Sequence, residues 1–143
     1  MNWLLNAQAL ASCWMCGLIW FVQIVHYPMF ARVTGDPSRA YAIEHQRRTT
    51  LVVGPPMLVE MVAAVLIVLF TPAHVPVWLA WTGVGMVLGL WVSTAAIQIP
   101  LHARLARDGH SEAVIRPLVR TNWARTVMWS ARALVSLWML AGR

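Results

Sequence analysis

Between Met61 and Ala103 the chain reads MVAAVLIVLFTPAHVPVWLAWTGVGMVLGLWVSTAAIQIPLHA and carries no Asp, Glu, Lys or Arg. A membrane-spanning helix needs about 20 predominantly apolar residues, so this stretch can hold the end of one span and a whole further span. The polar segment TPAHVP at 71–76 separates the two. A second charge-free run, residues 1–31, is long enough for one more span.

The whole chain has the composition of an integral membrane protein. Of its 143 residues 59% are apolar and 11% are charged, whereas about a quarter of the residues in a soluble domain are charged. We therefore predict an all-α, polytopic membrane protein, a four-transmembrane-helix bundle that forms a single domain over residues 1–143. The predicted spans are about 3–27, 49–70, 77–99 and 121–141.

The arginines predict the orientation of these spans. The loops 31–48 and 100–120 carry four arginines each, and the loop 71–76 carries none. The positive-inside rule then places the first two loops in the cytoplasm and both termini outside. No lysine occurs, which we interpret as GC-rich coding in a bacterium, so the predicted location is the bacterial cytoplasmic (inner) membrane. Because topology accounts for the net charge of +6, nucleic acid is not a predicted partner.

Two signals predict that helices begin inside the cytoplasmic loops. Asp36 before Pro37 is a cap residue followed by proline in the first turn, and Ser111 before Glu112 is a similar start. The second and fourth helices are therefore expected to begin before their apolar spans.

A shift of the chain along itself by 72 residues suggests an internal repeat. The shift gives nine identities in 71 pairs, among them Pro28 with Pro100 and Arg32 with Arg104. The first two spans would repeat as the last two, related by a pseudo-two-fold axis along the membrane normal. A duplication and a chance similarity are both open at this point.

The same shift places Glu60 on Arg132. Each residue lies roughly 11 positions, or ~16 Å, from the cytoplasmic end of its predicted span, close to the centre of the bilayer. A lone charge there costs at least ~2.5–3.5 kcal/mol, so we predict that these two side chains pair. The pair is either a structural clasp between the second and fourth spans or part of a ligand or proton site.

Further polar residues recur at helical spacing on the cytoplasmic side of this pair. They are Gln23 and His26 in the first span, Thr94, Gln98 and His102 at the end of the third, and Asn122 and Arg125 in the fourth. Polar side chains in a bundle face inward and often mark a pathway or pocket, so we predict an intramembrane pocket open to the cytoplasm. The alternative is hydrogen bonding between helices, worth ~0.6 kcal/mol per bond.

Metal and redox chemistry are not predicted. His26, His45 and His102 match no metal-ligand spacing, and a haem between His26 and His102 has no motif to support it. Cys13 and Cys16 form a Cys-x-x-Cys that is not followed by His, and small-residue packing explains it better. We predict no metal and no cofactor.

Three segments of the chain resemble a known family. They are WFVQIVHYP at 20–28, QIPLH at 98–102 and NWART at 122–126, and they are similar to the anthrone-oxygenase-like family of small four-span membrane proteins. Where that family often has Pro-Leu-Asn, this chain has Pro100-Leu101-His102. The resemblance implies binding or oxidation of an apolar aromatic small molecule without an evident metal or organic cofactor. It implies roles for Asn122, Arg125 and His102, because an Arg can stabilise an enolate oxygen and a His can take its proton.

The candidate site residues combine the polar pattern with the resemblance. The catalytic candidates are His26, His102, Asn122 and Arg125, and the substrate-binding candidates are Gln23, Glu60, Gln98 and Arg132. Whether the protein is an enzyme is left open. Two other functions fit the sequence, an accessory or structural subunit of a larger bacterial membrane complex and an oligomeric transporter or channel. The predicted partners are the lipid bilayer, an apolar small molecule, and other membrane subunits or further copies of the chain.

Overall fold

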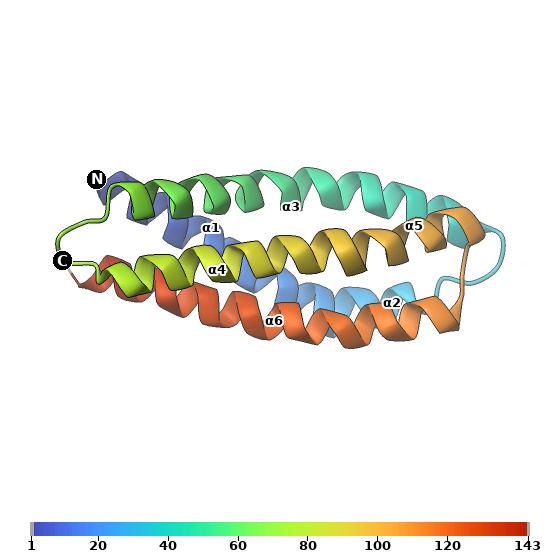
Figure 1. Ribbon diagram of the computed structural model, residues 1–143. Coiled ribbons are helices and arrows are strands. Elements are labelled where there is room, and N and C mark those ends of the chain that lie inside the picture. Colours follow the sequence, from blue (N-terminus) through green and yellow to red (C-terminus); the bar gives the residue numbers. More distant parts are fainter. Residues whose placement is uncertain (1, 143) are drawn as a thin grey trace.

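The computed structural model describes residues 2–142, and over that range it contains helices and no strand (Figure 1). The helices form four long rods. The rods are α1 (Asn2–Phe21) with the π-helix η1 (Val22–His26) and α2 (Tyr27–Phe30); α3 (Pro37–Leu69); α4 (Val77–Ser93) with the π-helix η2 (Thr94–Gln98) and α5 (Ile99–Asp108); and α6 (Glu112–Ala141). The predicted all-α class is confirmed.

Short connections make consecutive rods antiparallel. The chain ends and the 70–76 connection lie at one end of the bundle, and the 31–36 and 109–111 connections lie at the other (Figure 1). Helix α1 packs against α3 and α6, and α4 packs against the same two helices. Helices α3 and α6 are therefore diagonal partners, and their side chains meet at the centre of the bundle.

Three helical stretches are long and apolar enough to cross a membrane, namely Trp3–Phe30, Pro37–Leu69 and Val77–Asp108. They correspond to the first three predicted spans. Helix α6 has a comparable length of 30 residues, but it is too polar along its sequence to be grouped with them. Its polar residues include Asn122, Arg125 and Arg132, all of which are buried.

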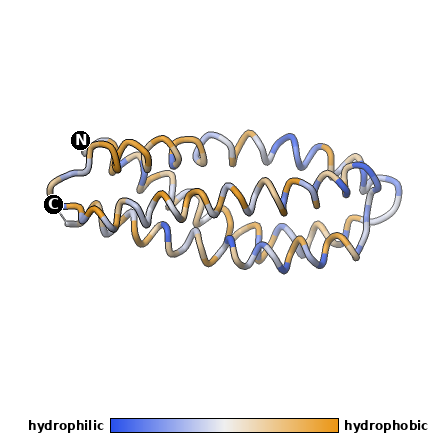
Figure 2. The backbone as a smooth tube through the Cα atoms, viewed as in Figure 1, coloured by the Kyte–Doolittle hydropathy of each residue, from blue (hydrophilic) through white to orange (hydrophobic). Residues whose placement is uncertain are grey.

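The outer surface of the bundle is apolar over much of its length. Large apolar side chains such as Leu10, Leu51, Leu69 and Leu134 are exposed. Figure 2 shows hydrophobic residues dominating the end with the termini and hydrophilic residues concentrated toward the end with the 31–36 and 109–111 connections. A soluble monomer rarely exposes such extensive apolar surface, whereas hydrocarbon requires it.

The helix starts agree with the sequence signals. Helix α3 begins at Pro37 after Asp36, and α6 begins at Glu112 after Ser111, although neither preceding side chain caps its helix by a hydrogen bond. Ser38 supplies the local bonds instead. Its hydroxyl donates to the carbonyl of Gly35 at 2.7 Å and accepts from the amide of His110 at 3.0 Å, which ties the two connections at this end together.

Both π-helices directly precede a proline-containing turn. Proline lacks an amide donor and its ring crowds the carbonyl four residues earlier, so the wider π turn relieves the chain at Pro28 and at Pro100. The two π-helices are separated by 72 residues at both ends (94 − 22 and 98 − 26). The C-terminal ends of α3 and α6 are separated by the same number (141 − 69).

Candidate functional site

The centre of the bundle holds the ion pair that the sequence predicts. Glu60 on α3 and Arg132 on α6 are 2% and 0% exposed, and Arg132 Nε lies 3.7 Å from Glu60 Oε1. Because these helices are diagonal partners, the pair crosses the middle of the bundle. It is surrounded by protein on all sides, so neither charge faces the outer apolar surface.

Neutral donors from two helices satisfy the carboxylate of Glu60. The Ser12 hydroxyl donates to Oε1 at 2.5 Å, and the Trp129 indole donates to Oε2 at 3.0 Å. The Ser136 hydroxyl donates to Ser12 Oγ at 3.0 Å and extends the network. A carboxylate that accepts bonds at both oxygens is well compensated even in a dry interior.

Arg132 is much less completely bonded. None of its three side-chain nitrogens has a hydrogen-bond partner among the described residues, and its only charged neighbour is Glu60 at 3.7 Å. On α4, Gly83 makes room for it, since a Cβ at Gly83 would lie 2.8 Å from Arg132 Nη1. The Glu60–Arg132 pair therefore brings together residues of all four rods and acts as a central clasp.

A cavity of about 370 Å³ lies between the rods, on the side of the clasp that is nearer to the 31–36 and 109–111 connections. This volume falls in the range of small-molecule sites, which is about 300–1,000 Å³. Most of its wall is apolar, and the larger apolar side chains are Met15, Leu18, Ile19, Val53, Met57 and Trp91. The polar side chains in its wall are Tyr27, His45, Gln46, Thr49, Thr50, Thr94, Gln98, His102 and Arg125.

Three of these polar side chains form one connected group. The Tyr27 hydroxyl donates to Gln98 Oε1 at 3.4 Å and lies 3.2 Å from His102 Nε2. The Gln98 amide donates to the Thr121 hydroxyl at 3.0 Å, which fixes its orientation. Gln98 belongs to η2, and Tyr27 follows η1 directly, so both π turns position polar groups at the cavity. Such π turns frequently occur at functional sites.

Three histidines from different rods lie in contact beside this group. His26 Nε2 is 2.9 Å from His45 Nδ1 with the rings stacked, and the rings of His45 and His102 have centroids 5.0 Å apart. The Thr49 hydroxyl is 3.2 Å from His45 Nδ1. In the part of the chain from residue 2 to 142, no group of three or more His, Cys, Asp or Glu side chains has an arrangement that could hold a metal ion. We interpret the histidines as a hydrogen-bonding cluster.

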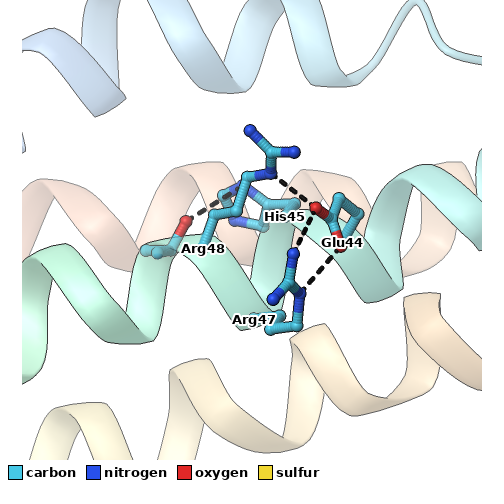
Figure 3. Close-up of polar contacts among 5 residues, drawn as sticks. Glu44, His45, Arg47 and Arg48 are labelled. Atoms are coloured by element: carbon cyan, nitrogen blue, oxygen red, sulfur yellow. Dashed lines mark hydrogen bonds and ion pairs between the residues drawn. The ribbon is translucent and has the colours of Figure 1, made fainter.

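The neighbouring carboxylate of Glu44 takes part in surface ion pairs. Figure 3 shows Glu44 beside His45, with the side chains of Arg47 and Arg48 both directed to it. Arg47 Nη2 lies 2.8 Å and Arg48 Nε 2.5 Å from Glu44 Oε1. Exposed ion pairs contribute little to stability, but this one keeps the carboxylate occupied outside the cavity.

Arg125 is held in the cavity wall by residues behind it. It is 7% exposed, its Nη1 donates to Asn122 Oδ1 at 3.1 Å, and its guanidinium lies 5.0 Å from the ring centroid of Trp129. The Asn122 amide in turn donates to Gln23 Oε1 at 2.8 Å. Gln23 and Asn122 therefore orient Arg125, while Trp129 links it to Glu60.

The structure distributes the eight predicted site residues over three places. Gln98, His102 and Arg125 line the cavity, and His26 contacts the cavity residue His45. The other four lie outside the wall: Gln23 and Asn122 behind Arg125, and Glu60 and Arg132 in the central clasp.

The sequence predicts no role for Tyr27, Thr49 or Trp129, and it suggests His45 only as a metal ligand. Tyr27 is adjacent to Pro28, but nothing in the sequence marks the π turn that directs it inward. Trp129 resembles the other tryptophans of the chain, and only its buried position distinguishes it.

Comparison with known proteins assigns no family to this chain. No protein-family model, no curated protein and no solved structure matches it. The resemblance to anthrone-oxygenase-like proteins therefore stays an expectation, and the function is inferred from the cavity and its side chains.

Proposed function

We propose that this chain is an integral membrane protein of four spans that binds an apolar, aromatic small molecule in the cavity of its cytoplasmic half. The cavity itself carries the proposal. It combines an apolar wall that includes Met15 and Met57 with a few polar groups gathered on Tyr27, Gln98 and His102. Ligand sites typically combine a large apolar lining with a few polar groups that orient the ligand.

The burial pattern of α6 supports a fourth span. The charged residues within its predicted span of 121–141, Arg125 and Arg132, are buried in the bundle, whereas Val127, Leu134 and Trp138 are exposed. Charged side chains in membrane helices face the interior in this way, and hydrocarbon contacts the apolar face. The polar residues of the span lower the average hydropathy of α6, but Asn122, Arg125 and Arg132 are buried, so a helix of this kind can lie in lipid beside the other three.

The repeated helix boundaries support a duplicated two-helix unit. The π-helices Val22–His26 and Thr94–Gln98 share the 72-residue offset that aligns Pro28 with Pro100 and Glu60 with Arg132. We propose two parallel repeats related by an axis along the membrane normal. In this arrangement the cavity lies between the halves, which is where repeat-built membrane proteins commonly bind ligands.

The orientation follows from the arginines. We propose that the end with the 31–36 and 109–111 connections faces the cytoplasm of a bacterium and that both chain ends face outward. The cavity then lies in the cytoplasmic half of the bilayer. Three exposed residues of its wall, Thr50 on α3, Ala95 on η2 and Ile99 on α5, place a mouth between these elements. A ligand dissolved in the lipid can enter there.

The polar groups available at the cavity are hydrogen-bonding groups. His102 and Tyr27 are 3.2 Å apart in the wall and can bond to a polar atom of a bound ligand. Oxidation of an aromatic ligand, which the family resemblance implies, is proposed as the reaction to test after binding. An accessory subunit or an oligomeric transporter needs a lateral protein contact, and the exposed apolar surface fits lipid equally well, so these two functions stay alternatives.

Binding is tested by photolabelling in lipid nanodiscs with benzophenone, a neutral aromatic probe. We expect crosslinks at Met15, Met57 and neighbouring cavity residues. The Gly54→Phe variant should abolish these crosslinks, because Gly54 lines the cavity, the new ring would fill it, and a Cβ at this position meets no atom within 4 Å.

The matched control is Gly85→Phe, at an exposed glycine outside the cavity that also has nothing within 4 Å of its Cβ position. It should label like the natural chain. Crosslinks spread over the lipid-facing residues, with no difference between the two variants, would contradict the proposal.

A further inference from the structure

The cavity wall contains a cation and no acid. Arg125 is in the wall, and neither Asp nor Glu occurs among the described residues that line the cavity. Arginine keeps its charge in proteins, and a buried charge is costly unless it is paired. A ligand in the cavity could therefore supply the negative charge that balances Arg125, unless an acid elsewhere in the chain does.

The acids of the chain are engaged elsewhere. The sequence has five. Glu60 pairs with Arg132, Glu44 with Arg47 and Arg48, Asp108 with Arg107, and Glu112 with Arg116, while Asp36 is exposed at the start of α3. No ion pair to Arg125 exists among residues 2–142. Within residues 2–142, therefore, no Asp or Glu side chain supplies the negative charge that would balance Arg125.

The guanidinium also has unused hydrogen-bonding capacity. Arginine has five N–H donors. The bond from Nη1 to Asn122 Oδ1 and a side-chain interaction with the Tyr27 hydroxyl account for two of them. The buried Nε has no partner in the described part of the chain. The contact with Trp129 stabilises the cation but accepts no hydrogen bond of the usual kind. An incompletely bonded arginine at a cavity wall is prepared to bind an oxygen acid.

We infer that the ligand of this cavity is an amphiphilic anion, with an acidic oxygen head such as a carboxylate held by Arg125 and an apolar body lying against Met15, Ile19 and Met57. This inference rests on the proposed binding function and specifies its ligand class. Tyr27 and His102 lie in the same wall and can donate further hydrogen bonds to the head.

The depth of Arg125 suits such a ligand. It lies four residues, or ~6 Å, inside the cytoplasmic start of the predicted fourth span at 121. An amphiphilic acid in a bilayer keeps its head near that level and its apolar body deeper. The lateral mouth at Thr50, Ala95 and Ile99 would admit it from the lipid without exposing the head to the bilayer centre. A free organic acid and the phosphate head of an anionic lipid share this chemistry.

The test compares two photoprobes with the same apolar body, 4-benzoylbenzoate and its neutral methyl ester, in phosphatidylcholine nanodiscs. We expect the acid to label the cavity residues at a concentration at least roughly tenfold lower than the ester. Arg125→Gln should remove this preference and leave labelling by the ester. The control Arg104→Gln, at an exposed arginine outside the cavity, should keep the preference.

Addition of phosphatidylglycerol distinguishes the two sources of the anion. Loss of acid labelling in proportion to the added lipid indicates a lipid head, and unchanged labelling indicates a free acid.

Equal labelling of the cavity by acid and ester in the natural chain overturns the inference and leaves the binding function standing. Absence of cavity labelling by either probe overturns the binding function itself. If Arg125→Gln does not fold, Arg125→Lys must retain the preference for the acid.

Discussion

Glu60 and Arg132 carry a large electrostatic penalty, because both are charged and almost fully buried. Glu60 is compensated by Ser12 and Trp129 as well as by Arg132, whereas Glu60, at 3.7 Å, is the one partner of Arg132 among residues 2–142. Breaking a buried pair costs more than the pair contributes, because the remaining charge has no counterion. If one of the two residues is replaced by a neutral one, the other therefore keeps a buried charge without a counterion.

We expect Glu60→Gln to destabilise the protein by about 3–5 kcal/mol, since Arg132 would keep a buried and unpaired charge. The double variant Glu60→Gln with Arg132→Met should recover most of that loss. The measurement is a double-mutant cycle of denaturant unfolding in detergent. Glu44→Gln, at an exposed ion pair, is the control and should change stability little. Additive effects of the two core changes would show that the pair is not coupled.

For single residues, the sequence predicts the buried ion pair but not the hydrogen bonds around it. Equal depth in two apolar spans was enough to pair Glu60 with Arg132. It could not show that Ser12 and Trp129 also bind the carboxylate, because those contacts depend on how each rod is rotated about its axis. The positions of His45 and Tyr27 depend on the same rotations.

The helices depart from regular α geometry at two corresponding places, η1 and η2. A π turn acts like one extra residue in an α-helix, so the chain on either side keeps its faces while the side chains within the turn are displaced. In η2 this displacement brings Thr94 and Gln98 to the cavity. The turn therefore sets which side chains face the cavity without changing how the rest of the helix packs.

We expect deletion of Ala96, an exposed residue of η2, to convert the π turn into an α turn and to leave the bundle folded. Photolabelling of the cavity should be lost, because Gln98 no longer lies at its wall. The control is deletion of the exposed Val62 of α3, a helix with no π turn to absorb the loss. It rotates the helix beyond it by about 100°, and should therefore unfold the protein. A folded ΔAla96 protein with full labelling would contradict this role for η2.

Helix ends could be predicted from the sequence and the π turns could not. Apolar runs interrupted by prolines place the predicted ends at 70 and 77, against Leu69 and Val77 in the structure. Hydropathy has no comparable signal for a single extra residue within a continuous helix. Pro28 and Pro100 mark the neighbourhood, yet proline alone is equally consistent with a kink or a helix start.

Taken as one object, the bundle has a polar end, an apolar end and a cavity nearer the polar end. Both chain ends lie together at the apolar end (Figure 1). If all four rods cross the bilayer, the chain crosses it an even number of times, because both chain ends lie at the same end of the bundle. The fourth crossing depends on α6, which is not among the three helices apolar enough by length and composition to span a membrane.

We expect alkaline phosphatase fused after residue 143 to be active and green fluorescent protein at the same position to be dark, because four spans return the C-terminus to the outer side. Fusions after His110, in the connection before α6, should give the reverse.

A chain with three spans would keep both positions in the cytoplasm and give a fluorescent C-terminal fusion. That result would remove α6 from the membrane and expose the buried Arg132 to a different environment, so it would also require a different account of the Glu60 pair. An active phosphatase would place α6 across the bilayer, with Glu60 and Arg132 both near its centre. Their burial would then follow from the cost of exposing a charge to hydrocarbon, which pairing in the bundle interior avoids.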